Sequence, residues 1–268
     1  YYTRIDAEGG AGLLDRKSRA ALTKAVRAAQ KRTGERAVRR LTTTAEDGRL
    51  RFVEQPPTMG PLEPEQRALV RRHIQAYEQS AAPDVRTVLS HYTPVDTARR
   101  VVGVGSVGTR CALVLFQDGD GNGFIMQSKQ AGRSVLEQYG GIAQPSVLTD
   151  LVDAHGQGAR VVSLQRILQA VSDPFLGYLR TDAFDLYVRQ FHDMKGGIEI
   201  TELDDRPFGT YAAACGVALA RAHSQSSRAT LIAGYIGSGD AVTEAILEWS
   251  TAYADLAEED YRAFLNAD

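Results

Sequence analysis

Hydrophobic residues recur at helical spacing near both ends of the chain and alternate as in strands between them. Leu22, Ala25, Val26 and Ala29 lie three or four residues apart on one face, which predicts a helix that Asp15 caps and that runs to about residue 32. In the last quarter of the chain, the same spacing predicts helices over 207–226, 228–235 and 240–265.

Turn residues and prolines divide the region between these helices into shorter elements. Pro64 suits the first turn of a helix, which we expect to reach about Ser80. The other expected elements are a hairpin of 41–44 and 49–53, helices at 84–91, 134–139 and 162–170, and strands at 99–105, 109–117, 123–130, 175–180 and 184–192.

A glycine-rich motif, Gly-x-Gly-x-x-Gly, ends the apolar run before residue 109 and is the clearest sign of a ligand. It consists of Gly103, Gly105 and Gly108, with Ser106 between them. Glycines let backbone amides approach a polyphosphate because no Cβ stands in the way. Lys129, at the end of a later apolar run, supplies a positive charge. The motif therefore predicts a phosphate-binding site.

Two unrelated architectures use this spacing. In a dinucleotide-binding domain a helix follows the glycines and an acid holds the ribose, whereas in kinases the glycines lie in a hairpin and the lysine on the third strand. Here residues 109–116 are rich in β-branched and aromatic residues, and an Asp-Gly and Asn-Gly run follows them. We favour the kinase-like hairpin, with an NAD(P) site and a glycine turn without a ligand as alternatives.

The expected element order fits an α+β fold of the protein-kinase-like type, with an antiparallel small-lobe sheet and helical lobe segments. We divide the chain into a helical and hairpin segment (1–95), a nucleotide-binding small lobe (96–195) and a C-terminal helical segment (196–268). Lys129 would contact ATP phosphates and pair with Glu137, and Arg189 and Gln190 would lie near the adenine. No kinase catalytic loop follows these residues, because neither Asp193 nor His223 stands in such a motif.

The composition of the chain argues against nucleic acid and membranes as binding partners. Basic residues crowd 16–40, but no aromatic residues are interleaved with them, so a solvated helix face explains them better than a nucleic-acid surface. No apolar run reaches the length of a membrane span, and two cysteines form no disulfide framework, which fits the cytoplasm. A calcium loop at 118–129 is excluded, since Lys129 stands where a bidentate acid is required.

Four stretches together resemble the bacterial family named domain of unknown function 2252, in the same order and over nearly the whole chain. They are residues 103–110 (GVGSVGTR), 187–196 (YVRQFHDMKG), 218–223 (ALARAH) and 232–237 (IAGYIG). The resemblance implies a protein-kinase-like fold. It also implies a circularly permuted arrangement in which the catalytic and Mg²⁺-binding carboxylates precede the small lobe, so that they would lie outside this chain.

We therefore expect the ATP-binding region of a kinase-like phosphotransferase, with an unknown phosphate acceptor and with Mg²⁺ ligands and catalytic residues outside this chain. The alternatives are an NAD(P)-dependent oxidoreductase and a non-catalytic, pseudokinase-like module. Whether the chain is an enzyme stays open at this stage.

Overall fold

The computed structural model of the protein describes residues 15–30, 34–101, 103, 107–169, 172–191 and 198–267. It combines helices with antiparallel sheets, so the expected α+β class is confirmed. The chain divides into two compact units, residues 1–216 and 217–268. The division falls inside helix α8 (Asp205–His223), so residues 196–216 belong to the first unit.

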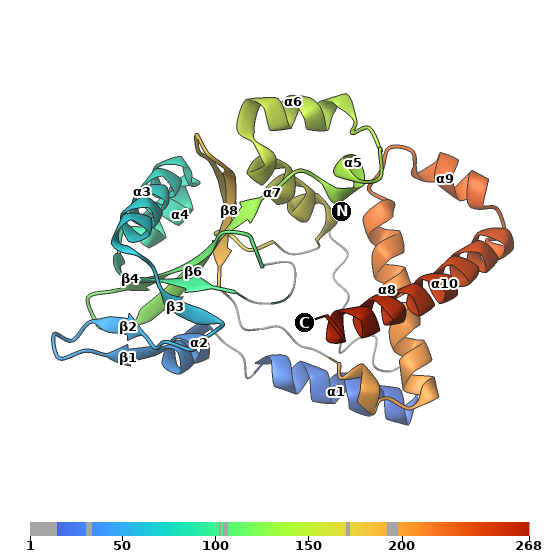
Figure 1. The fold of residues 1–268 in the computed structure, drawn as a ribbon, viewed down its shortest axis with the longest axis horizontal. Coiled ribbons are helices and arrows are strands. Elements are labelled where there is room, and N and C mark those ends of the chain that lie inside the picture. Colours follow the sequence, from blue (N-terminus) through green and yellow to red (C-terminus); the bar gives the residue numbers. More distant parts are fainter. Residues whose placement is uncertain are drawn as a thin grey trace. The chain divides into compact units, whose positions relative to one another are not determined.

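A six-stranded sheet forms the centre of the first unit (Figure 1). Its strands lie in the order β3-β4-β5-β6-β8-β7, and every neighbouring pair is antiparallel. They are β3 (Met59–Pro61), β4 (Thr93–Arg100), β5 (Cys111–Gln117), β6 (Gly123–Ala131), β7 (Gly177–Arg180) and β8 (Asp185–Gln190). A separate two-stranded sheet consists of β1 (Thr42–Thr44) and β2 (Leu50–Phe52).

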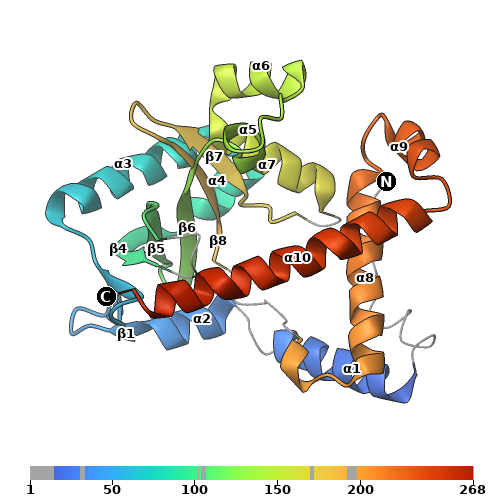
Figure 2. The same ribbon diagram turned by 45° about the vertical axis from the view of Figure 1, so that its right-hand side comes forward.

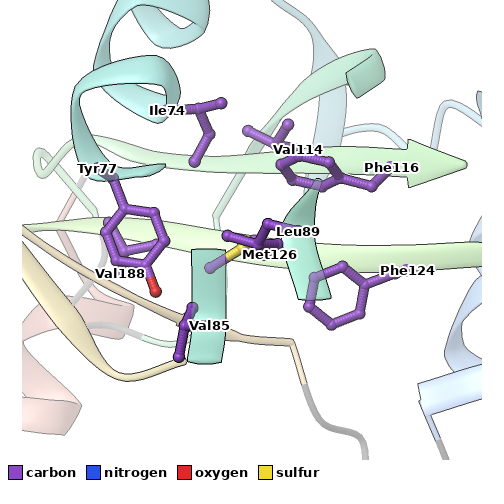
Figure 3. Close-up of a cluster of buried hydrophobic side chains, with 9 residues drawn as sticks. All are labelled: Ile74, Tyr77, Val85, Leu89, Val114, Phe116, Phe124, Met126 and Val188. Atoms are coloured by element: carbon purple, nitrogen blue, oxygen red, sulfur yellow. The ribbon is translucent and has the colours of Figure 1, made fainter. Parts of the chain in front are cut away.

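One face of the six-stranded sheet, called the α3 face below, is covered by α3 (Pro64–Ser80) and α4 (Pro83–Leu89). Alternate residues of the strands point into this layer. Figure 3 shows the resulting cluster, with the two helices contributing Ile74, Tyr77, Val85 and Leu89, and the strands contributing Val114, Phe116, Phe124, Met126 and Val188. The Tyr77 hydroxyl donates a hydrogen bond of 2.7 Å to the Phe175 carbonyl, which satisfies the polar end of this side chain.

The opposite face, called the α2 face, is covered by α2 (Gly34–Leu41), which contacts β6, and by β2, which contacts β4 and β5. The apolar side chains in this layer are Val38, Leu41, Met59, Ala98, Leu113, Leu115 and Ile125. Helix α7 (Gln157–Leu168) packs against β7 and β8, where Gly158 and Ala159 are buried. A Cβ at Gly158 would lie next to the Cβ of Tyr178, which pairs with Tyr187 of β8. The neighbour of Tyr187 on β8, Val188, points to the α3 face, so Tyr187 and Tyr178 point to the α2 face. Helix α7 therefore lies on the α2 face.

Helix α1 (Arg16–Gln30) begins as the sequence predicts. The Asp15 side chain accepts hydrogen bonds from the backbone amides of Lys17 and Ser18, so it caps the helix. The basic side chains of α1 form exposed ion pairs with the segment before and at the start of α8: Lys17 with Asp204 and Lys24 with Glu202, each at 2.6 Å. Lys17 and Lys24 are thus exposed lysines of α1 that have acidic partners within the protein.

The second unit contains the end of α8, then α9 (Ala229–Ile236) and the long helix α10 (Asp240–Leu265), which Figure 2 shows as one continuous rod. On α10 the rings of Trp249 and Tyr253 stack at 5.2 Å, one turn apart. Among the residues that the structure describes, no helix combines the length and the apolar character needed to span a membrane.

Several predicted elements begin or end elsewhere. The strand expected at 99–105 is β4, which begins at Thr93 and ends at Arg100. It does not continue through Gly103, whose φ of +76° does not fit an extended strand. The helix expected at 162–170 is α7, which begins at Gln157. The sequence analysis did not predict α2, β3 or α6 (Ser146–His155), although Val147, Leu148, Leu151 and Val152 give α6 apolar residues at helical spacing.

Candidate functional site

The glycine-rich connection joins two neighbouring antiparallel strands, β4 and β5. Gly103 and Gly108 have φ of +76° and +79°, which residues with a Cβ rarely adopt. A Cβ added at either position would meet no other described atom within 4 Å, so the positive φ, and not a close neighbour, is what favours glycine here. Two other predicted site residues, Gly105 and Ser106, lie outside the described residues.

The end of this connection, just before β5, is hydrogen-bonded to β6. The Gln130 amide donates a hydrogen bond of 2.9 Å to the Arg110 carbonyl, and the Arg110 amide donates one of 3.2 Å to the Gln130 side chain. The glycine connection therefore ends directly beside the residue that follows Lys129.

Lys129 lies on β6, opposite Cys111 of β5 and Tyr187 of β8. Residues that are directly opposite in antiparallel strands share one face of the sheet. Gln127 and Arg189 form the adjacent pair on that face. Lys129, Arg189, Gln127, Cys111 and Tyr187 therefore gather on the α2 face, and we call them the Lys129 cluster.

Hydrogen bonds hold part of this cluster in place. The Arg189 guanidinium donates from Nε (3.2 Å) and Nη2 (3.0 Å) to Oε1 of Gln127. The Gln127 Nε2 donates to the Cys111 sulfur at 3.4 Å. Gln127 is buried, so its amide connects the arginine of one strand to the thiol of another without exposure to water.

Positive charge dominates the cluster. Burial raises the pKa of the Cys111 thiol, whereas the charges of Lys129, Arg189 and Arg100 act in the opposite direction. Arg100 ends β4 and contacts the Met59 sulfur through Nη1. Three cations from three strands thus lie close enough to influence one thiol, an arrangement that attracts an anion.

Glu137 does not pair with Lys129. It lies on α5 (Val135–Gln138), and its carboxylate accepts a hydrogen bond of 2.8 Å from Arg133, one turn earlier. Within the described part of the chain, Lys129 forms no ion pair, and its side chain is half-buried. The ammonium is therefore available to a ligand that carries negative charge.

The predicted adenine-contacting residues point in different directions. Arg189 belongs to the Lys129 cluster, whereas Gln190, the next residue on β8, faces the other side of the sheet. The Gln190 amide donates a hydrogen bond of 2.7 Å to the Asp173 carboxylate, and the Phe191 amide donates one to Ile125. The polypeptide amides at this end of β8 are therefore already bonded within the protein.

A family model described as "Uncharacterized protein conserved in bacteria (DUF2252)" matches residues 1–267. The chain belongs to this family. The resemblance noted in the sequence is thus confirmed, and it extends over both compact units. Comparison with curated proteins and with solved structures finds no match.

The chemistry available to this DUF2252 protein follows from its side chains. Ammonium and guanidinium groups bind phosphate and carboxylate oxygens. Among the described residues, no group of three or more His, Cys, Asp or Glu side chains is arranged to hold a metal ion. The sequence predicted Lys129 and Arg189 as site residues but not Gln127, Cys111 and Arg100; no sequence signal for Gln127 is stronger than its position directly after the apolar run 124–126.

Proposed function

We propose that the central sheet binds a nucleoside triphosphate, ATP, as the nucleotide-binding part of a kinase-like phosphotransferase. One observation carries the proposal. The glycine-rich connection joins two antiparallel strands, and Lys129 lies on the next strand, in a cluster of cations on one face. In protein kinases a glycine-rich hairpin covers the phosphates and a lysine on the third strand contacts them.

The order of elements after Lys129 supports the same assignment. Helices α5, α6 and α7 separate β6 from β7, and β8 then returns to lie beside β6. In kinases a helix at this point in the chain carries the acid that pairs with the lysine. Here α7 packs on the α2 face, the face of the Lys129 cluster.

The connection gives less support to an NAD(P)-dependent oxidoreductase. In the dinucleotide architecture the glycines lead into a helix whose N-terminus faces the pyrophosphate, within a parallel sheet. In this protein they lead into β5, and each pairing of the sheet is antiparallel. An acid for the ribose is also missing at the end of β6, where Lys129 stands.

Kinases bind ATP together with Mg²⁺, and the described residues supply only some of the groups that phosphoryl transfer requires. The Lys129 cluster could hold phosphate oxygens, but the ligands for Mg²⁺ would come from residues beyond those described. Transfer would break the bond from the bridging oxygen to the γ-phosphorus, form a bond to the acceptor oxygen and pass the acceptor proton to a base. The described cluster contains no such base.

A non-catalytic nucleotide-binding module is therefore the second candidate. Helix α7 carries no Asp or Glu, and Glu137 is bonded to Arg133, so Lys129 lacks the acidic partner that active kinases use. Release or transfer of the γ-phosphate from Mg-ATP distinguishes the candidates: binding with turnover supports the phosphotransferase, and binding without turnover supports the module.

Calorimetry with Mg-ATP and NADH tests the nucleotide assignment. We expect Lys129→Met to keep the fold and to weaken ATP binding about tenfold or more, because a charge-assisted contact contributes roughly 1.5–3 kcal/mol. Lys129→Arg should restore binding only in part, since its planar fork does not occupy the position of the ammonium. The matched control is Lys24→Met, an exposed lysine of α1 that pairs with Glu202.

The proposal fails on either of two results. Tight binding of NADH with no ATP signal would make the dinucleotide alternative correct. Equal ATP affinity in the wild type, Lys129→Met and Lys24→Met, with unchanged melting curves, would show that Lys129 does not contact the nucleotide.

A further inference from the structure

A cavity lies on the α3 face, on the other side of the sheet from Lys129. Its volume is about 160 Å³, and it opens between α3 and strands β4, β5, β6 and β8. Ala112 and Ser128 lie at its floor; they are register partners, and they alternate with Cys111 and Lys129, whose side chains point to the opposite face. The cavity thus opens on the face opposite Lys129, although Cys111, a member of the Lys129 cluster, also contributes to its lining.

The walls of this cavity are mostly apolar. The apolar lining residues are Leu62, Leu69, Val70, Ala112, Phe184 and Leu186. The Ser128 side chain is buried beside them, and within the described residues its hydroxyl makes no hydrogen bond. An apolar cavity of about 150 Å³ is large enough to hold benzene. The space therefore suits one six-membered ring, and the Ser128 hydroxyl is available to a polar substituent; Gln66 and Thr109 are the other uncharged polar residues of the lining.

Positive charge surrounds the opening. Arg99 and Arg110 line the cavity and are exposed, and neither forms an ion pair with a described carboxylate. The Arg110 guanidinium lies 4.5 Å above the centre of the Phe184 ring, so an aromatic wall positions it. No acidic residue lines the cavity.

His73 of α3 also lines the cavity. The centres of the His73 and Phe184 rings lie 5.7 Å apart, and the rings are nearly perpendicular. Burial lowers the pKa of His73, and the nearby charges of Arg72 and Arg110 lower it further, so the imidazole is neutral at neutral pH. A neutral imidazole adds no charge of its own and can donate or accept one hydrogen bond.

We propose that this cavity binds a small aromatic carboxylate, with the ring against Leu69, Ala112 and Leu186 and the carboxylate at Arg110 and Arg99. The apolar walls and the volume select a single ring, and the two arginines without an acidic neighbour select a negative charge. The proposal does not rest on ATP binding, because Leu69, Ala112 and Leu186, which would hold the ring, lie on the face opposite Lys129.

Benzoate is the probe, and benzamide, which has the same shape without the charge, is its neutral comparison. Ligand-observed NMR and calorimetry on the full chain measure both. We expect saturable binding of benzoate at millimolar concentration or below, about tenfold tighter than benzamide, since a hydrogen bond to a charged group is the stronger kind. Benzylamine, a cation of the same size, should not bind.

Two substitutions locate the site. Leu69→Trp fills the cavity and should abolish binding of both benzoate and benzamide, while its melting curve reports whether the fold is kept. Arg110→Gln changes an exposed side chain and should weaken benzoate about tenfold, with benzamide unchanged. The matched control for Arg110→Gln is Arg71→Gln. Arg71 is an exposed arginine of α3 that does not line the cavity.

Three outcomes would overturn the proposal. The first is no saturable binding of benzoate at millimolar concentration. The second is benzoate binding that a folded Leu69→Trp variant retains, which would place the ligand elsewhere. The third is equal loss of benzoate affinity in Arg110→Gln and Arg71→Gln, which would reduce the effect to the general charge of the surface.

Discussion

Replacing Gly158 with alanine should push α7 away from the sheet and destabilise the protein. Gly158 is the second residue of α7, and a Cβ at this position would lie 2.2 Å from the Leu186 carbonyl oxygen and 3.1 Å from the Tyr178 Cβ. The carbonyl oxygen is a backbone atom and the Cβ is bonded directly to the backbone, so neither can move away by a side-chain rotation. Because nonbonded heavy atoms are most stable at about 3.5–4.0 Å, the helix must move by roughly 1 Å.

The expected cost follows from this displacement. Overpacking of a buried contact typically costs about 1–3 kcal/mol. Alanine is favoured over glycine inside a helix by up to ~1 kcal/mol, but Gly158 lies in the first turn, where this gain is small. We therefore expect the free energy of unfolding of Gly158→Ala to fall by about 1–3 kcal/mol.

Gly209→Ala is the matched control. Gly209 lies inside α8, in the same compact unit, and a Cβ there would meet no atom within 4 Å. The same substitution should therefore stabilise the protein, by about 0.5–1 kcal/mol. Urea unfolding followed by circular dichroism gives both values, and hydrogen exchange of the α7 amides shows whether the loss is local. If Gly158→Ala is as stable as the wild type, the close contact between α7 and β8 is absent.

Three further predictions concern single side chains. The pKa of His73 is lowered from 6.5 in the folded protein, so the unfolded chain binds the proton more readily. The free energy of unfolding should therefore fall as the pH drops from 6.5 through the folded pKa. The difference in unfolding midpoint between wild type and His73→Gln across this pH range measures the loss. Asp185→Ala removes the carboxylate that accepts a 2.6 Å hydrogen bond from the Gln157 amide at the start of α7, and should cost about 0.5–2 kcal/mol in urea unfolding, with no loss if the cap is replaced by water. Gln127→Met keeps the volume but frees the Arg189 guanidinium, so ATP affinity should change while the melting curve stays within a few degrees; an unchanged affinity would show that Arg189 has no part in binding.

The sequence predicted best those elements whose ends have a local cause. The helix expected from Pro64 to Ser80 matches α3, since proline at the first helical position fixes its start. The α10 range of 240–265 also matches, because its apolar residues keep helical spacing throughout. Short elements such as β3 carry no pattern of their own, and their strand character comes from pairing with β4.

The same distinction applies to the site. Glycines and a lysine have chemistry that the sequence displays, so Gly103, Gly108 and Lys129 could be named in advance. The pairing of Glu137 with Arg133 depends on a single turn of helix, and a sequence separation alone does not choose between Arg133 and Lys129. Cys111 and Arg189 join Lys129 through the register of three strands, which sequence alternation does not define.

The short outer strands of the central sheet affect how copies of the protein can meet. A sheet edge offers unpaired backbone groups to another chain, and long flat edges promote aggregation. Here one edge is β3, with three residues, the last of which, Pro61, has no amide hydrogen to donate. The other edge is β7, with four residues, against which α7 packs. An intermolecular ladder on either edge would contain only a few hydrogen bonds, so concentrated solutions of the protein should not assemble through this sheet.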